Sequence, residues 1–291
     1  MTESQKVTGL NMLNRGCSEL AESRRAERKK QSLLQVNKHF SVTRNAESAN
    51  SDQALATSKT IGLIGGLSWA STSHYYEKIN RETNHILGGQ ASANLLISSL
   101  DFQPIITAQT KNNWEFIEGR ILNEIKLLKS AGVDFFAIAS NTIHYALRNF
   151  DPTSILTVNN IFDAVADECK AKNISKICLI GTRYTMTFPF FKNEYERRGI
   201  KCLTPSTKIQ TEINQWIFKE LIHGIASETC LRDLIKCCET IISDLPEAQA
   251  IVLGCTELSV LGPIWRLNVP SIDTTEIHCK SIVAQSICHL S

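Results

Sequence analysis

Several features that would assign a protein to a specialised class are missing from this sequence of 291 residues. No apolar run approaches the roughly 20 residues of a membrane span, and the N-terminus lacks the apolar core of a signal peptide. The net charge is only +2, so neither nucleic acid nor an anionic membrane is an expected partner. We therefore expect a cytoplasmic protein that binds neither nucleic acid nor membranes.

Paired cysteines and a complete nucleotide-binding glycine motif are missing as well. The chain has ten cysteines but no CxxC pair, and without a secretory signal we expect reduced thiols and no metal site. Gly65 and Gly66 follow an apolar run, yet the full GxGxxG fingerprint of a dinucleotide site is absent. Cys237 and Cys238 lie in a helical pattern and are predicted to be packing residues.

Residues 1–58 differ from the rest of the chain in composition. Asn, Ser, Gln, Arg and Glu dominate there, and sustained apolar periodicity is absent. A basic run from Arg24 to Lys30 has the composition of a short exposed helix. The sequence predicts a basic, disordered N-terminal extension, and a sorting or partner-binding segment is the alternative interpretation.

From residue 59 onward, short apolar runs alternate with helical patterns. Apolar runs of this length are typical of strands buried in a parallel sheet, and their alternation with helices predicts right-handed crossovers. Ser68 and either Asp273 or Thr274 are placed to cap the helices that follow them. The predicted strands are 60–66, 94–100, 134–139, 176–182, 201–203 and 250–253, and the predicted helices are 69–87, 114–131, 143 onward, 188–198, 209–223, 228–243 and 274–289.

The same pattern occurs twice along the chain. Gly65 and Gly181 are 116 positions apart, and Ser140 and Cys255 are 115 positions apart. Such internal similarity indicates a duplication. We predict an α/β fold of two pseudo-symmetric three-layer α/β/α domains with parallel sheets and an active site in the interdomain cleft. The first domain would comprise 59–157 plus 273–291, and the second 158–272.

Cys255 is the first candidate for chemistry because it follows the apolar strand 250–253 and Gly254. A thiol there lies at the carboxyl end of a strand, where open α/β sheets bind ligands. Ser140 holds the equivalent place in the first half. The two residues should therefore face each other across a cleft, with a small ligand between them.

Four motifs of this chain resemble those of the aspartate/glutamate racemase family, over about residue 59 to the end. The resemblance implies two pseudo-symmetric α/β domains, an amino-acid substrate, no cofactor and a homodimer. It also implies a two-base reaction, in which a thiolate removes the α-proton and a thiol on the opposite face returns one. The matching motifs are Ile61-Gly62-Leu63-Ile64-Gly65-Gly66-Leu67-Ser68-Trp69, Ser140-Asn141-Thr142-Ile143-His144, Gly181-Thr182-Arg183-Tyr184-Thr185-Met186 and Gly254-Cys255-Thr256-Glu257.

Ser140 is the main departure from the family pattern, because a cysteine usually stands there. Some relatives specific for acidic L-amino acids carry a hydroxyl residue at this place and remain active. A thiol has a pKa of about 8.5, which a helix N-terminus or a nearby cation can lower, whereas an alcohol is a far weaker acid. We therefore predict that Cys255 is the main base, that Ser140 acts on the opposite face, and that the two enantiomers react unequally.

Residues beside these two are the candidates for holding the substrate. Side chains and free backbone N–H groups just beyond a strand favour an anion such as the α-carboxylate. His144 lies one helical turn beyond Ser140 and could contact its hydroxyl or the ligand. The predicted substrate-binding residues are Asn141, Thr142, Thr256, Ser68, Thr185 and His144.

The expected cation for a distal carboxylate is missing from the sequence. The segment around Thr211 and Glu212 aligns with the one that usually supplies it, and a Glu212 side chain in the site would repel a second carboxylate. Lys111 and Lys208 are the remaining candidates. The substrate is thus predicted to be aspartate, glutamate or a less acidic relative.

Two other functions stay open. A single-cysteine lyase or isomerase similar to malonate decarboxylases would protonate one face with Cys255 and need no partner thiol. A catalytically inactive ligand-binding relative would explain both the serine at position 140 and the absent cation.

Overall fold

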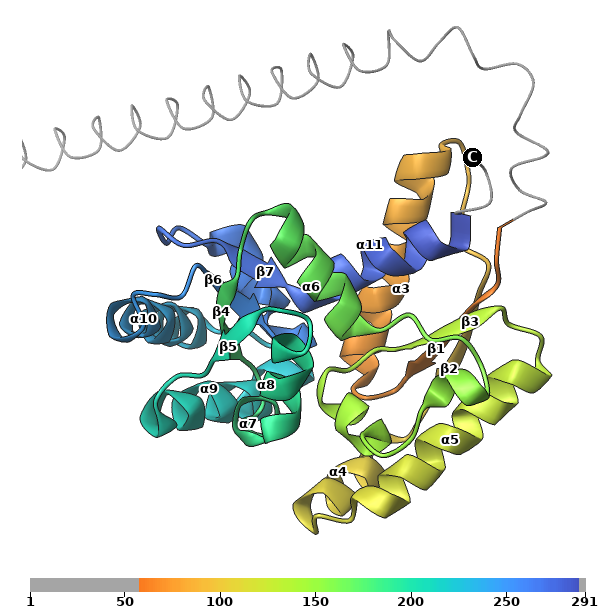
Figure 1. Cartoon of the computed structure of the whole chain (residues 1–291), viewed down its shortest axis with the longest axis horizontal. Helices are drawn as coiled ribbons and strands as arrows, with labels where there is room; N and C mark the ends of the chain where they lie inside the picture. The colour runs from red at the N-terminus through yellow and green to blue at the C-terminus, as the bar shows by residue number, and fades with distance from the viewer. Residues whose placement is uncertain (1–57, 288–291) are drawn as a thin grey trace, which may run out of the picture. The chain divides into compact units, whose positions relative to one another are not determined.

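Two parallel β-sheets organise residues 58–287, which are the residues described by this computed structural model (Figure 1). The strand order is β2-β1-β3 in the first sheet and β5-β4-β6-β7 in the second, and all neighbouring strands run parallel. The α/β class and the parallel sheets are therefore confirmed. The strands are β1 (Ile61–Gly65), β2 (Leu95–Ser99), β3 (Phe135–Ile138), β4 (Lys176–Ile180), β5 (Lys201–Leu203), β6 (Ala250–Leu253) and β7 (Ser271–Asp273).

Helices cover both faces of the first sheet, which explains why β1 and β3 are apolar throughout. Ile64 and Ile138 pack on one face against α4 (Phe102–Thr110) and α5 (Trp114–Ser130). Leu63 packs on the other face against α3 (Trp69–Leu87) and α11 (Thr274–Ile287). Three layers result.

The second sheet is layered in the same way. Ile180 and Leu253 pack on one face against α9 (Thr207–Lys219) and α10 (Glu228–Asp244). Leu179 and Val252 pack on the other face against two further helices, α6 (Ile161–Ala171) and α8 (Pro189–Glu196). The predicted three-layer α/β/α arrangement is confirmed for both sheets.

The predicted helix caps are present. Ser68 accepts a hydrogen bond from the backbone N–H of Ser71 at the start of α3. Asp273 accepts from the backbone N–H groups of Thr275 and Glu276 at the start of α11. Both caps satisfy N–H groups that have no partner inside the helix.

Helix α11 connects the two sheets. It follows directly on β7 of the second sheet and packs beside α3 on the first, as Figure 1 shows. Residues 58–287 lie within one compact unit of the chain. The boundaries predicted for two separate domains stay a prediction, and the basic N-terminal extension, 1–58, falls almost wholly outside the described residues.

Several elements were not predicted. Helix α4 contains Pro104, and a proline inside a helix usually breaks it. This proline is tolerated because it stands in the first turn, where backbone N–H groups have no intrahelical partner. Strand β7 has only three residues, and α6 and α7 (Arg183–Thr187) were overlooked. The helical turns after Ser140 and Cys255 are 3₁₀ helices: η1 (Thr142–Leu147) and η4 (Thr256–Ile264), in addition to η2 (Pro152–Ser154) and η3 (Leu221–His223).

Candidate active site

Gly254 fixes the position of Cys255 at the end of β6. A Cβ atom at Gly254 would lie 2.7 Å from Leu179 Cδ1 and 3.0 Å from the backbone oxygen of Ile180. Such distances leave no room for any side chain. Because Gly254 has no side chain, β6 can end close against β4. Cys255 then lies beside the loop that follows β4.

Ser140 and Cys255 line one small cavity, which residues following strands of both sheets enclose. Its volume is about 40 Å³, far below the several hundred Å³ of pockets for drug-sized ligands. Ser140 and Cys255 are only 8% and 7% exposed. This is a closed arrangement, in which the cavity is too small for a ligand the size of a free amino acid. The residues after β3 and β6 that line it are Ser140, Asn141, Thr142, Cys255, Thr256 and Glu257.

The thiol of Cys255 is paired with a carboxylate. Its Sγ donates a hydrogen bond to Glu257 Oε2 at 2.9 Å. Burial, the charge of Glu257 and this hydrogen bond all raise the pKa of Cys255 well above its usual range. A helix terminus or a cation, either of which can lower a thiol pKa, does not prevail here, because the thiol is buried and faces an anion. Cys255 is a protonated thiol with an acceptor for its proton in contact.

Glu257 also connects the two halves of the chain. Its Oε1 accepts hydrogen bonds from Ser71 Oγ at 2.9 Å and from Ser68 Oγ at 3.0 Å. Both serines lie at the N-terminal end of α3, where the helix dipole favours a negative charge. Oε1 of Glu257 is thus held by α3, and Oε2 faces the thiol.

Within residues 58–287, Ser140 has no acceptor comparable to Glu257. Its Oγ accepts a long hydrogen bond of 3.4 Å from the backbone N–H of Ile143. His144 contacts the backbone oxygen of Ser140 through Nδ1 at 2.7 Å, and not the hydroxyl. Burial lowers the pKa of His144 to about 4, so the ring is neutral and Nδ1 carries the proton. Ser140 is therefore a hydroxyl without a base beside it.

Polar side chains from both halves meet in and beside the cavity wall. Thr142 Oγ1 lies 2.9 Å from Thr182 Oγ1 and 3.3 Å from Thr185 Oγ1. Asn141 Nδ2 donates to Thr274 Oγ1 at 2.9 Å, and Thr274 donates in turn to the backbone oxygen of Leu253. These contacts hold the residue after Ser140 against the strand that carries Cys255.

The predicted residues do not all reach the cavity. Ser140, Asn141, Thr142, Cys255 and Thr256 line it. Ser68, Thr185 and His144 do not, although each contacts a residue that does. These three side chains contact the lining without being part of it.

The remainder of the cavity wall is mainly apolar. Helix α4 contributes Phe102, Ile106 and Gln109, and the segment from α9 to η3 contributes Ile217, Phe218 and Ile222. The lining is completed by Leu67, Ile143, Thr182, Tyr184 and Gly254. The residues of α4 were missed because the helix itself was missed. The sequence motif contains Glu257, but its contact with the thiol was not predicted. Its position two residues after Cys255 is the sequence feature that could have indicated this contact.

The segment expected to supply a cation lies elsewhere. Glu212 accepts a hydrogen bond from Cys237 Sγ at 3.4 Å, and it lines a surface groove together with Lys208. Neither residue lines the cavity, so Glu212 is not placed to repel a carboxylate there. The wall formed by the described residues contains no lysine or arginine.

A second cavity adjoins the first. It has a volume of about 370 Å³ and shares Thr256 and Glu257 with the smaller one. Ser71 and His74 also line it. Glu257 therefore stands between the closed cavity with the thiol and a larger space.

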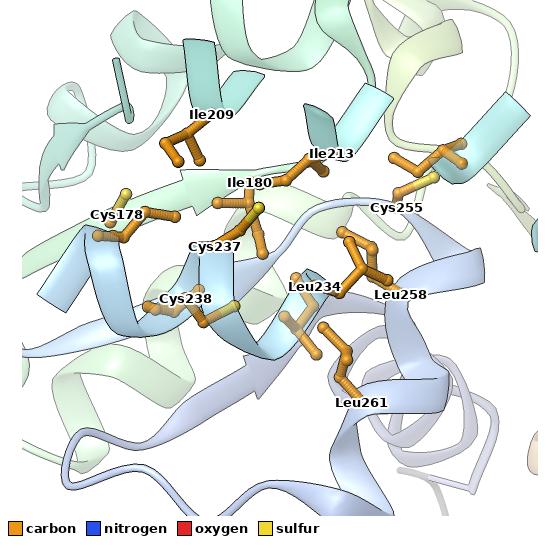
Figure 2. Close-up of a cluster of buried hydrophobic side chains, with 14 of the residues drawn as sticks. Cys178, Ile180, Ile209, Ile213, Leu234, Cys237, Cys238, Cys255, Leu258 and Leu261 are labelled. Carbon is orange, nitrogen blue, oxygen red and sulfur yellow. The ribbon is translucent and has the colours of Figure 1, made fainter. Parts of the chain in front are cut away.

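The other described cysteines belong to the hydrophobic core. Cys237 and Cys238 on α10 lie inside the cluster that covers one face of the second sheet, and Figure 2 shows Cys255 at its edge. All eight cysteines within the described range have free thiols. Among residues 58–287 no group of three or more His, Cys, Asp or Glu side chains is arranged to hold a metal ion. In that same range, no helix has the length and apolar character to cross a membrane.

Comparisons with known proteins agree on one kind of relative. Residues 64–282 match the family model for Asp/Glu/hydantoin racemases. RacX of Bacillus subtilis (strain 168), a broad-specificity amino-acid racemase, is 21% identical over 235 residues, which cover 79% of this chain and 100% of RacX.

Solved structures give the same result. A candidate Asp/Glu racemase from Yersinia pestis has 35% sequence identity and a TM-score of 0.70, covering 79% of this chain and 99% of that one. PH1733, an aspartate racemase homologue from Pyrococcus horikoshii OT3, has 28% identity and a TM-score of 0.67, covering 78% and 99%. The range matched by the family model contains every cavity residue named above.

Proposed function

Because this chain belongs to the Asp/Glu/hydantoin racemase family, we propose that it is an isomerase that inverts the Cα atom of an amino acid without a cofactor. The observation that carries the proposal is the buried pair of Cys255 and Glu257, which faces the same cavity as Ser140. Inversion at Cα requires that a proton leave one face and that another arrive at the opposite face. The cavity supplies one group of each kind.

Cys255 acts as the base, with Glu257 as the acceptor of its proton. The thiol proton moves to Glu257 Oε2, 2.9 Å away, as the sulfur takes the α-proton. A free thiolate would be costly here because burial and the carboxylate both raise the thiol pKa. The α-ammonium group of a bound amino acid would reduce this cost, since it brings a positive charge beside the pair.

Ser140 returns a proton to the opposite face. Its hydroxyl donates to the carbanion and is then restored from solvent, while Glu257 releases the proton it has taken. The larger cavity that Glu257 borders offers a path for that release. Because no base contacts the Ser140 hydroxyl, removal of an α-proton from this side is the slower half of the reaction.

Asn141, Thr142 and Thr256 would hold the α-carboxylate. All three line the cavity and stand at the beginning of a helical turn, where backbone N–H groups attract an anion. Aspartate and glutamate are the substrates that the family description suggests, and RacX shows that a relative can have broad specificity.

Proton exchange tests this proposal. Loss of the Cα proton of L- and D-amino acids in deuterated buffer is followed by NMR, for the unaltered protein and for Cys255→Ala. Cys238→Ala is the matched control, since Cys238 is equally buried in the same cluster but does not line the cavity. We expect exchange that Cys255→Ala abolishes and Cys238→Ala retains.

Other outcomes point to the alternatives. Release of carbon dioxide from a malonate, without α-proton exchange, would support a single-cysteine lyase. A ligand-induced rise in melting temperature without any exchange would support a binding protein.

A further inference from the structure

The part of the cavity wall that comes from α4 and from the segment between α9 and η3 is mainly apolar. Phe102, Ile106 and Gln109 follow one another at helical spacing, so they form one face of α4 that is turned to the cavity. Ile217, Phe218 and Ile222 contribute from a separate segment. The only polar side chain in these two segments that lines the cavity is the neutral amide of Gln109.

The described residues that line the cavity contribute no positive charge to balance this wall. Glu257 is the only charged residue among the described residues that line the cavity. Arg183 stacks on Tyr184, with its Cζ atom 5.2 Å from the ring centroid, but Arg183 is exposed and does not line the cavity. Lys208 lies in the separate surface groove. A second carboxylate would therefore lose its water, gain no ion pair and be repelled by Glu257.

We propose that this cavity selects amino acids with uncharged, mainly apolar side chains and discriminates against aspartate and glutamate. The inference rests on the proposed racemase function and specifies its substrate. The small volume of the cavity strengthens the selection, because it leaves little room for water to solvate a carboxylate.

A panel of substrates of similar size but different charge tests the inference. The exchange rate of the α-proton is measured for L-leucine, L-asparagine and L-aspartate, with L-methionine and L-glutamate as a longer pair. We expect kcat/KM for exchange to be at least about 100-fold higher for leucine than for aspartate, with asparagine between them. Equal or faster exchange of aspartate and glutamate would overturn the inference and leave the racemase function intact. Absence of exchange for every member of the panel would overturn both.

A variant provides an independent test on the wall itself. Gln109→Lys introduces a cation on the cavity face of α4, and Gln103→Lys places the same charge on the exposed side of the same helix. Gln109→Lys should raise the ratio of aspartate to leucine exchange by at least about tenfold, and Gln103→Lys should leave it unchanged. An equal ratio of aspartate to leucine exchange in both variants would contradict the assignment of this wall to the substrate side chain. If Gln109→Lys does not fold, the substrate panel with the unaltered protein still decides the question.

Discussion

Replacing Glu257 by glutamine should lower both the activity and the pKa of the thiol, although a lower thiol pKa would ordinarily increase the fraction of thiolate available as the base. The carboxylate raises the pKa of Cys255 through its charge and through the hydrogen bond, in addition to the larger effect of burial. Glutamine is neutral, so the thiol pKa falls while burial still holds it above the usual range. At the same time the thiol loses the group that accepts its proton.

The magnitude of the activity loss follows from that second effect. Removal of a positioned general base typically costs about 10²–10⁴-fold in rate. Stability should change by less than about 1.5 kcal/mol, because the remaining amide oxygen can still accept from Ser68 and Ser71. The exposed Glu247→Gln is the control and should alter neither quantity.

Two assays are needed. Exchange of the α-proton gives the activity, and alkylation of the Cys255 peptide at a series of pH values, resolved by mass spectrometry, gives the thiol pKa. A variant with most of its exchange activity intact, or with a higher thiol pKa than the unaltered protein, would refute the role given to Glu257.

Three further predictions concern the opposite face, the strand end and the buried histidines. Ser140→Ala should abolish inversion but retain exchange from the enantiomer whose α-proton faces Cys255. Ser140→Cys should make the exchange rates of the two enantiomers more equal. Chiral chromatography measures the inversion, and NMR measures the exchange. Gly254→Ala should destabilise the protein by about 1–3 kcal/mol in urea unfolding, because its Cβ would lie 3.0 Å from the Ile180 backbone oxygen. Burial lowers the pKa of His144 to about 4 and of His278 to about 3, so their contribution to stability is complete above about pH 6.5 and is lost as the pH falls toward 4. Urea unfolding at pH 7 and pH 4 should differ by a few kcal/mol, and equal values would contradict this account.

The sequence predicted those parts of the site that depend on local pattern. Apolar runs identified β3 and β6, and the residues after them were Ser140 and Cys255, both of which line the cavity. Cap chemistry identified Ser68 and Asp273 because a cap depends on residues two or three positions away.

The features that were not predicted depend on packing between segments that are far apart in the sequence. Ser68 and Glu257 are 189 positions apart, and only the packing of α3 near η4 brings them together. The direction of the Cys255 pKa follows from that same packing, since the thiol is buried beside a carboxylate. The direction in which Glu212 points could not be predicted either. The position of a residue within a turn of α9 decides whether its side chain faces the cavity or the surface groove.

The central claim is that Cys255 is the one strong base and Ser140 only returns a proton. Racemisation has an equilibrium constant of one, so kcat/KM for inversion must be equal in the two directions and cannot reveal the asymmetry. The ratio of α-deuterium exchange to inversion can reveal it, measured separately for the L- and D-forms of the best substrate. We predict a ratio well above one for one enantiomer and near one for the other, with both processes lost in Cys255→Ala. Equal ratios for the two enantiomers, or exchange that survives in Cys255→Ala, would contradict the account.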